Sequence, residues 1–283
     1  MIELRSTTAS DVGVLEIGDD LVVNRFGFGA MRITGDGVWG PPPDHAGAIA
    51  VLRRAIDLGV NLIDTADAYG PSVSEELIAE ALMPYPEDLV IATKGGLVRS
   101  GPGQWQADGS PEHLRAACEG SLRRLRLEQI PLYQFHRVDP SVSLAESLGA
   151  LVELKGEGKV LHIGLSNVTI DQLQEAQSIT SIVSVQNRYN LGDRSSEAVL
   201  ERCLYERIAF LPWAPLANLE RNRSAAEIAT KHGATLTQVA LSWLLRRSPV
   251  MLPIAGTSSV AHFEENLAGV AMDLSEDDFA ALG

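Results

Sequence analysis

Residues 61–94 read NLIDTADAYGPSVSEELIAEALMPYPEDLVIATK. A short apolar run at 61–65 is followed by a segment with helical spacing of its apolar residues at 73–82, and a second apolar run follows at 88–94. Short β-rich runs on either side of an amphipathic helix are typical of two parallel strands joined by a crossover helix. The stretch therefore predicts one β-α-β unit.

The same alternation continues on both sides of this unit. Further strands are expected at 25–31, 131–136, 160–166, 181–186, 208–213 and 250–256. Further helices are expected at 45–59 (with Asp44 as N-cap and Gly59 as terminator), 111–125, 142–158, 169–177, 195–206, 224–233, 235–247 and 260–268. Eight such units predict an α/β fold, a (β/α)8 TIM barrel. Within residues 1–24, the alternating segments IELRS (2–6) and LVVNR (21–25) predict an N-terminal β-hairpin that closes the barrel floor.

Length and composition agree with one barrel. The 283 residues, of which 45% are hydrophobic and 21% charged, suit a single barrel domain over 1–283. No GxGxxG motif is present, and no linker or shift in composition marks a second domain. A doubly wound dinucleotide-binding sheet is therefore disfavoured.

Charge and cysteine content bear on partners and location. The 23 Lys and Arg against 37 Asp and Glu give a formal net charge of -14, which argues against nucleic acid as a partner. Cys118 and Cys203 form no metal-binding pattern and read as reduced thiols. The acidic N-terminal segment lacks a long apolar run, so neither a signal peptide nor a membrane anchor is expected. We expect a cytoplasmic protein without metal.

Polar residues at strand ends are the candidates for chemistry, because barrel active sites lie at the carboxyl ends of the strands. Asp64, Lys94 and His136 end three expected strands, and Tyr69 lies in the loop after Asp64. Alone, each has an ordinary structural explanation in capping, packing or solvation. Together they predict a site: a nearby lysine lowers the pKa of a tyrosine from about 10, and an aspartate holds that lysine. Tyr69 would then act as general acid, and His136 would bind a substrate oxygen.

At this point the chain resembles the aldo-keto reductase family. The motifs that carry the resemblance are NLIDTADAYG, VIATKGG, LYQFHRVDP, IGLSN, VQNRYN, PWAPLA and GTSSVAHFEENLAG, which occur in order over nearly the whole chain. The resemblance implies a monomeric (β/α)8 barrel that binds a nicotinamide cofactor without a Rossmann domain. It places the catalytic tetrad on Asp64, Tyr69, Lys94 and His136.

The resemblance also implies the cofactor contacts. Ser166, Asn167 and Gln186 would hold the nicotinamide carboxamide, and Trp213 would stack on its ring, with core packing as the alternative for the tryptophan. Further lining residues would be Gly29, Ala30, Met31, Pro215 and Leu216. The adenosine-phosphate end would be formed by Gly256, Thr257, Ser258, Ser259, His262, Glu265 and Asn266, where a helix N-terminus offers N–H groups to an anion.

The phosphate end departs from the family pattern. Many members carry Lys or Arg where this chain has Gly256, Ser258 and His262, so the strongest charge-assisted contacts to a 2′-phosphate are missing. NADPH is the expected cofactor, and NADH is not excluded.

The expected activity is NAD(P)H-dependent reduction of a small aldehyde or ketone, such as pyridoxal, a sugar-derived carbonyl or a small ketone. Two alternatives stay open. One is a barrel aldolase with Lys94 as Schiff-base nucleophile, which the charge of Asp64 disfavours. The other is a cofactor-sensing regulatory or scaffold subunit with little turnover. Long pocket loops are not evident in the sequence, which predicts an open pocket and broad specificity.

Overall fold

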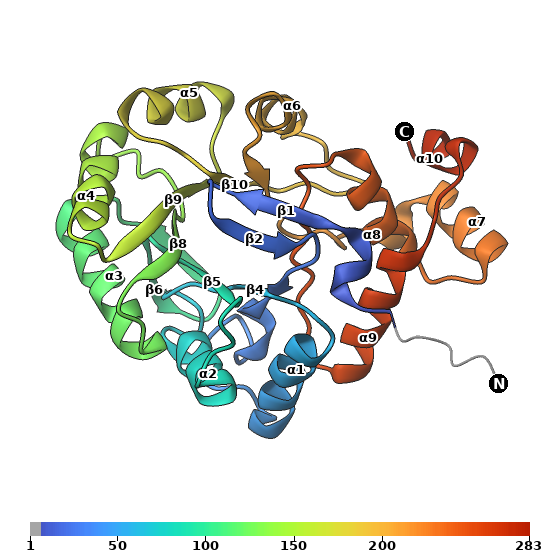
Figure 1. The fold of residues 1–283 in the computed structure, drawn as a ribbon, viewed down its shortest axis with the longest axis horizontal. Coiled ribbons are helices and arrows are strands. Elements are labelled where there is room, and N and C mark those ends of the chain that lie inside the picture. Colours follow the sequence, from blue (N-terminus) through green and yellow to red (C-terminus); the bar gives the residue numbers. More distant parts are fainter. Residues whose placement is uncertain (1–6) are drawn as a thin grey trace.

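The computed structural model describes residues 7–283 and shows a parallel sheet curled into a barrel (Figure 1). Seven strands pair in the order β11-β10-β9-β8-β5-β4-β3, and every pairing is parallel. Their bounds are Phe28–Gly29 (β3), Leu62–Asp64 (β4), Val90–Gly95 (β5), Ile130–Phe135 (β8), Val160–Ser166 (β9), Ser184–Gln186 (β10) and Ala209–Phe210 (β11). The expected (β/α)8 barrel is confirmed, with one difference at its closure.

The closing junction is formed by residues 250–256, the eighth expected strand. This segment joins the two ends of the sheet through isolated parallel bridges, Phe210 with Met251 and Gly27 with Ile254. Gly27 N–H donates to the carbonyl of Pro253 at 2.9 Å, but Pro253 has no N–H to donate in return. The segment therefore occupies the place of a strand without forming a continuous ladder.

Ten α-helices are present in the described residues, and most of them surround the barrel (Figure 1). Their bounds are His45–Asp57 (α1), Val73–Leu82 (α2), Pro111–Leu125 (α3), Leu144–Gly156 (α4), Ile170–Ile179 (α5), Glu197–Glu206 (α6), Arg223–His232 (α7), Leu236–Arg247 (α8), Val260–Ala268 (α9) and Glu276–Leu282 (α10). Asp44 caps α1 as expected by accepting from the Gly47 N–H. Only α10 was not expected.

An antiparallel hairpin crosses the end of the barrel that lies at the amino ends of the strands. It is formed by β1 (Val14–Ile17) and β2 (Leu21–Asn24). Its side chains Ile17 and Val23 are buried in one cluster with Leu62 and Leu252 from the barrel interior. The hairpin expected for LVVNR is confirmed, but its partner strand is 14–17; the segment IELRS lies outside the described residues.

A second hairpin, which the sequence pattern does not predict, follows β5. Strands β6 (Leu97–Gly101) and β7 (Gln104–Ala107) pair antiparallel, with a register shift between Arg99 and Gly101. The segment RSGPGQWQ resembles a loop because it is polar and rich in Gly and Pro. The hairpin stands at the carboxyl end of β5, the end of the barrel where β5 delivers Lys94.

In the part of the chain that the structure describes, no helix is both long and apolar enough to cross a membrane.

Candidate active site

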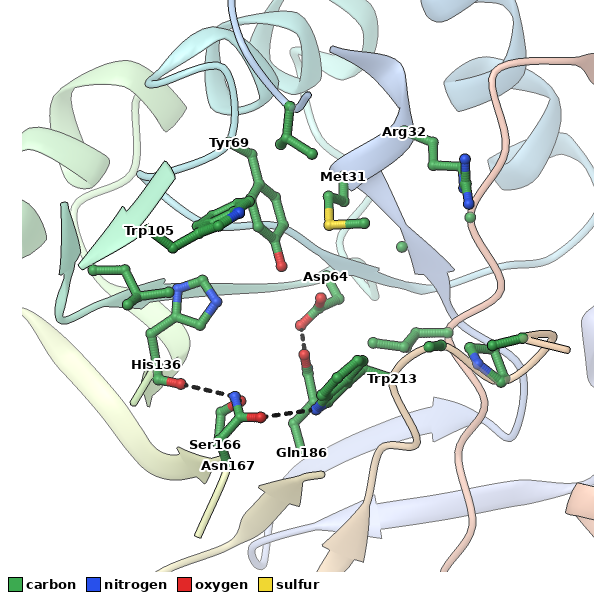
Figure 2. Close-up of a pocket in the computed structure, with 18 of the residues that line it drawn as sticks. Met31, Arg32, Asp64, Tyr69, Trp105, His136, Ser166, Asn167, Gln186 and Trp213 are labelled. Atoms are coloured by element: carbon green, nitrogen blue, oxygen red, sulfur yellow. Dashed lines mark hydrogen bonds between the residues drawn. The ribbon is translucent and has the colours of Figure 1, made fainter. Parts of the chain in front are cut away.

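A cavity of about 690 Å³ opens at the carboxyl ends of the barrel strands (Figure 2). Its wall includes three of the four predicted catalytic residues, Asp64, Tyr69 and His136. The predicted cofactor residues on its wall are Gly29, Met31, Ser166, Asn167, Gln186, Trp213, Pro215, Leu216 and Gly256. The strand-end residues collected from the sequence thus meet in one place.

Lys94 lies behind this wall and is completely buried. Its Nζ donates to Asp64 Oδ2 at 2.7 Å and to the carbonyl of Thr65 at 2.8 Å. Burial by itself lowers the pKa of Lys94, but the charge of Asp64 and the neighbouring Tyr69 outweigh it and raise the pKa above the usual value. Lys94 is therefore an ammonium group fixed within the barrel.

The second carboxylate oxygen of Asp64 accepts two further hydrogen bonds. Gln134 Nε2 donates to Oδ1 at 3.0 Å and Gln186 Nε2 donates to it at 2.8 Å. Gln134 was missed from the sequence because it stands inside the apolar run PLYQF; a polar residue buried within a strand was the available signal. These two amides and Lys94 use both oxygens of Asp64, so its orientation is well determined.

Tyr69 sits next to this ion pair, with its Oη 3.5 Å from Lys94 Nζ. The ammonium also lies 5.2 Å from the centre of the phenol ring. Burial raises the pKa of Tyr69, the charge of Lys94 lowers it, and Asp64 raises it again, so that the pKa lies above its usual value. The expectation of a lowered pKa is wrong for this state because desolvation outweighs the lysine. The phenol consequently keeps its proton at neutral pH.

His136 contacts Tyr69 edge-on, with ring centroids 5.8 Å apart. Burial and then the charge of Lys94 hold the pKa of His136 well below its usual range. The ring is therefore a neutral imidazole at neutral pH, and its Nδ1 is buried without a partner among the described residues. A neutral imidazole can donate one hydrogen bond to a substrate oxygen.

On the other side of the cavity, Trp213 is held by Asn167 (Figure 2). The indole Nε1 donates to Asn167 Oδ1 at 3.1 Å, and Asn167 Nδ2 donates to the His136 carbonyl at 3.1 Å and to Ser166 Oγ at 2.9 Å. Asn167 has a left-handed backbone with φ of 59°, which asparagine tolerates. Trp213 is half-buried in the cavity wall, unlike a fully buried core tryptophan.

Where the barrel closes, the backbones of Gly29 and Gly256 approach each other closely. A Cβ on Gly256 would lie 2.2 Å from the carbonyl oxygen of Gly29, so glycine is required there. Met31 follows on the rim and is partly exposed. Ala30 does not line the cavity: it is buried, and its carbonyl accepts from Ser74 Oγ at 3.1 Å.

Of the residues predicted for the adenosine end, Gly256 lines the cavity, whereas the others lie beyond its wall, around the N-terminus of α9. Thr257 Oγ1 accepts from the Ser259 N–H at 3.1 Å, and Ser259 Oγ caps the helix at the His262 N–H. Ser258 and His262 are exposed, Glu265 is half-buried and Asn266 is buried. A cation that the sequence analysis missed, Arg32, lines the cavity from the 3-10 helix Ala30–Ile33.

Comparison with known proteins places these features in a family. The Aldo/keto reductase family matches residues 25–283. The chain is 50% identical over 277 residues to an oxidoreductase of Schizosaccharomyces pombe (97% of this chain, 90% of the relative). It is 44% identical over 268 residues to the pyridoxine 4-dehydrogenase of Escherichia coli (92% of this chain, 94% of the relative).

Among solved structures, the aldo/keto reductase from Klebsiella pneumoniae in complex with NADP and acetate superposes with a TM-score of 0.80 at 26% identity. The match covers 95% of this chain and 93% of that one. A barrel with this arrangement of Asp64, Tyr69, Lys94 and His136, together with a family match over almost the full length, leads to one conclusion: the chain belongs to the aldo/keto reductase family of oxidoreductases.

Proposed function

We propose that this protein uses NADPH to reduce an aldehyde or a ketone to the alcohol, with Tyr69 as the proton donor. The observation that carries the proposal is the phenol of Tyr69 on the cavity wall, protonated at neutral pH and 3.5 Å from a buried ammonium. A general acid that is protonated at neutral pH can donate its proton to the substrate oxygen, which the reduction of a carbonyl requires.

The residues of the cavity fit a nicotinamide dinucleotide. The indole of Trp213 is anchored through its N–H, which leaves a flat apolar face in the wall. Gln186 donates its amide N–H to Asp64, so its carbonyl oxygen is available for a carboxamide.

Gly29 and Gly256 keep the wall free of side chains near the closing junction. Arg32 supplies a cation for a phosphate. NADP bound to the related Klebsiella enzyme supports this assignment.

Each member of the tetrad has a distinct task in this mechanism. The bound cofactor supplies the hydride that the carbonyl carbon accepts. The neutral imidazole of His136 hydrogen-bonds the carbonyl oxygen and orients it. Tyr69 Oη gives its proton to that oxygen as negative charge develops on it. Lys94 stabilises the resulting phenolate, and Asp64 keeps the ammonium in place.

The geometry disfavours the Schiff-base alternative. A lysine nucleophile must be neutral, whereas Asp64 holds Lys94 in the charged form at a distance of 2.7 Å. For the substrate, the 44% identity to a pyridoxine 4-dehydrogenase makes pyridoxal a first candidate.

The test is an assay of NADPH oxidation with a panel of aldehydes that includes pyridoxal. We expect turnover by the wild type and a loss of about 10²–10⁴-fold in Tyr69→Phe, the range for a positioned general acid. NADPH binding, followed by the quenching of protein fluorescence, should be nearly unchanged because the ring still packs. Tight NADPH binding without turnover of any carbonyl would instead support the cofactor-sensing subunit, and equal turnover by Tyr69→Phe would contradict the mechanism.

A further inference from the structure

The unexpected hairpin places an indole beside the catalytic phenol. Trp105 on β7 lines the cavity and is 36% exposed. Its ring centroid lies 6.3 Å from that of Tyr69 and 6.5 Å from that of His136, in both cases edge to face. Figure 2 shows Trp105 on the same side of the cavity as Tyr69 and His136. A large, partly exposed aromatic surface therefore adjoins the two groups that would bind the carbonyl oxygen.

Arg99 fixes the orientation of this indole. The register of the hairpin sets Arg99 directly opposite Trp105, and the guanidinium carbon lies 3.6 Å from the centre of the indole ring. A cation over the face of an indole is an attractive arrangement. One face of Trp105 is thus covered by protein.

The guanidinium of Arg99 is itself held by backbone carbonyls. It donates to Val38 at 2.7 Å, to Gly37 at 2.8 Å and to Ala68 at 2.9 Å, and Nε donates to Gln104 at 2.8 Å. These bonds join the hairpin to the loop at 37–38 and to the loop that carries Tyr69. The indole is therefore preorganised relative to the catalytic phenol, without a bound ligand.

The cavity wall also includes two apolar side chains from the segments that Arg99 joins. Leu97 and Val38 line the same cavity, and Val38 has a left-handed backbone with φ of 57°, an unusual conformation for a β-branched residue. Its carbonyl is one of the acceptors of Arg99. The arginine that positions the indole therefore also holds this loop in its unusual conformation.

From this geometry, and resting on the proposed carbonyl reduction, we infer that Trp105, positioned by Arg99, makes the enzyme selective for planar conjugated carbonyl compounds, in which the aldehyde or ketone is attached to an aromatic or heteroaromatic ring. A flat ring can stack on or pack edge-on against the indole while its carbonyl oxygen reaches Tyr69 and His136. A saturated ring of the same size gains apolar contact but not the aromatic contact.

The experiment compares benzaldehyde with cyclohexanecarbaldehyde, which match in size and differ in planarity. In Trp105→Leu, kcat/KM for benzaldehyde should fall by up to about 10-fold, mainly through KM, because the aromatic contact is lost together with part of the apolar contact. The value for cyclohexanecarbaldehyde should change less than about 3-fold, and Trp105→Phe should retain most of the preference. NADPH affinity and the thermal midpoint should stay at the wild-type values, since Trp105 is on an exposed hairpin.

Trp39→Leu is the matched control. Trp39 also contacts the Arg99 guanidinium, at 5.7 Å, but it does not line the cavity. Its replacement should leave the ratio of the two aldehydes unchanged. Arg99→Met should lower the preference for benzaldehyde with NADPH affinity retained, and Arg99→Lys should restore part of it.

The outcomes separate this inference from the function on which it rests. A wild-type enzyme that reduces both aldehydes, combined with an equal loss for both in Trp105→Leu, would overturn the inference and leave the carbonyl reductase intact. The same holds if Trp39→Leu abolishes the preference as fully as Trp105→Leu. A wild type that binds NADPH and reduces neither aldehyde nor any other carbonyl would remove the function and the inference together.

Discussion

Tyr69 receives opposite influences from its two charged neighbours and from its burial. Lys94 favours the phenolate, while Asp64 and the loss of solvent favour the phenol, and the phenol prevails. The lysine therefore does not make the tyrosine acidic in the resting protein. In the proposed mechanism, Lys94 contributes after proton transfer, when the phenolate of Tyr69 would otherwise be buried without a counter-charge.

The first prediction concerns pH. Because the pKa of Tyr69 is raised and that of His136 is lowered, neither group changes its protonation between about pH 6.5 and 10, the usual values of the two side chains. We expect kcat/KM for reduction to be flat across neutral pH. Measured profiles should show no ionisation near 6.5; one that vanishes in His136→Gln would contradict the neutral imidazole.

The same two pKa shifts also make the stability of the fold depend on pH. The raised pKa of Tyr69 stabilises the fold below about pH 10, and this contribution is lost as pH rises through the raised value. The lowered pKa of His136 contributes above about 6.5, and this contribution is lost as pH falls through the lowered value.

The second prediction separates the two members of the buried ion pair. Lys94→Met leaves Asp64 buried without its counter-charge and should lower the free energy of unfolding by about 3–5 kcal/mol. The double variant Asp64→Asn with Lys94→Met should recover much of that loss, because no charge remains. Urea unfolding of Lys94→Met, of Asp64→Asn and of the double variant measures the coupling; additive losses would show that the pair does not act as a unit.

At the scale of elements, the approach of the closing junction to β3 depends on glycine. The third prediction is that Gly256→Ala destabilises the protein by about 1–3 kcal/mol, because its methyl group would collide with the backbone oxygen of Gly29. Gly149→Ala in α4 is the control: nothing lies within 4 Å of its added Cβ, so it should be neutral or stabilising by up to about 1 kcal/mol. Thermal unfolding distinguishes them, and equal effects would mean that the contact is relieved elsewhere.

The fourth prediction concerns the preference for NADPH over NADH and is based on the N-terminus of α9. This region offers backbone N–H groups, hydroxyls and an exposed His262 and carries no Lys or Arg, while Arg32 is available at the cavity. One charge-assisted hydrogen bond of about 1.5–3 kcal/mol gives a preference for NADPH over NADH of roughly 10- to 10²-fold. Parallel titrations of both cofactors measure it. A preference of many thousandfold, or a preference for NADH, would show that the phosphate site is built otherwise.

Individual elements show what the sequence could and could not predict. Asp64, Lys94 and His136 were found because each ends an apolar strand, and strand ends converge in a barrel. The β6–β7 hairpin was missed because its stability depends on contacts far along the chain, such as the Arg99 bonds to Val38 and Ala68, which local composition does not encode. The pKa direction of Tyr69 was missed because it depends on the degree of burial, which only the folded structure provides.

At the scale of the whole molecule, two tryptophans occupy different environments, one in the cavity wall and one in the core. Trp213 is half-buried in the cavity wall, whereas Trp243 on α8 is completely buried and stacks on Tyr189 with ring centroids 5.8 Å apart.

The fifth prediction is that Trp213→Ala weakens NADPH binding and leaves the fold intact. Trp243→Ala should cost about 3–5 kcal/mol of stability. Calorimetry with and without cofactor tests both; a collapse of stability in Trp213→Ala with unchanged affinity would reassign it to the core.

The alternation of strands and helices was visible throughout the chain, so the barrel followed from periodicity. The way in which the barrel closes did not follow from periodicity. Residues 250–256 have the pattern of a strand, but Pro253 interrupts the ladder of hydrogen bonds, and only isolated bridges join the segment to Gly27 and Phe210. A run of apolar residues indicates that a segment is buried. Whether that segment pairs as a strand depends on the backbone donors and acceptors of the segments on both sides of it.

The closing junction has a consequence for how the barrel fluctuates. Few backbone hydrogen bonds cross it, among them those of the Gly27, Phe210 and Leu252 amides, so local opening should need less free energy there than between β8 and β9. Ile254, Ala255 and Gly256 also line the cavity, so a dinucleotide seated there would bind the closed form alone. Deuterium uptake at the Gly27, Phe210 and Leu252 amides would then slow by a factor of about 1 + [L]/Kd, where [L] is the concentration of free cofactor. The free energy of local opening at the junction would thus rise with the concentration of the cofactor.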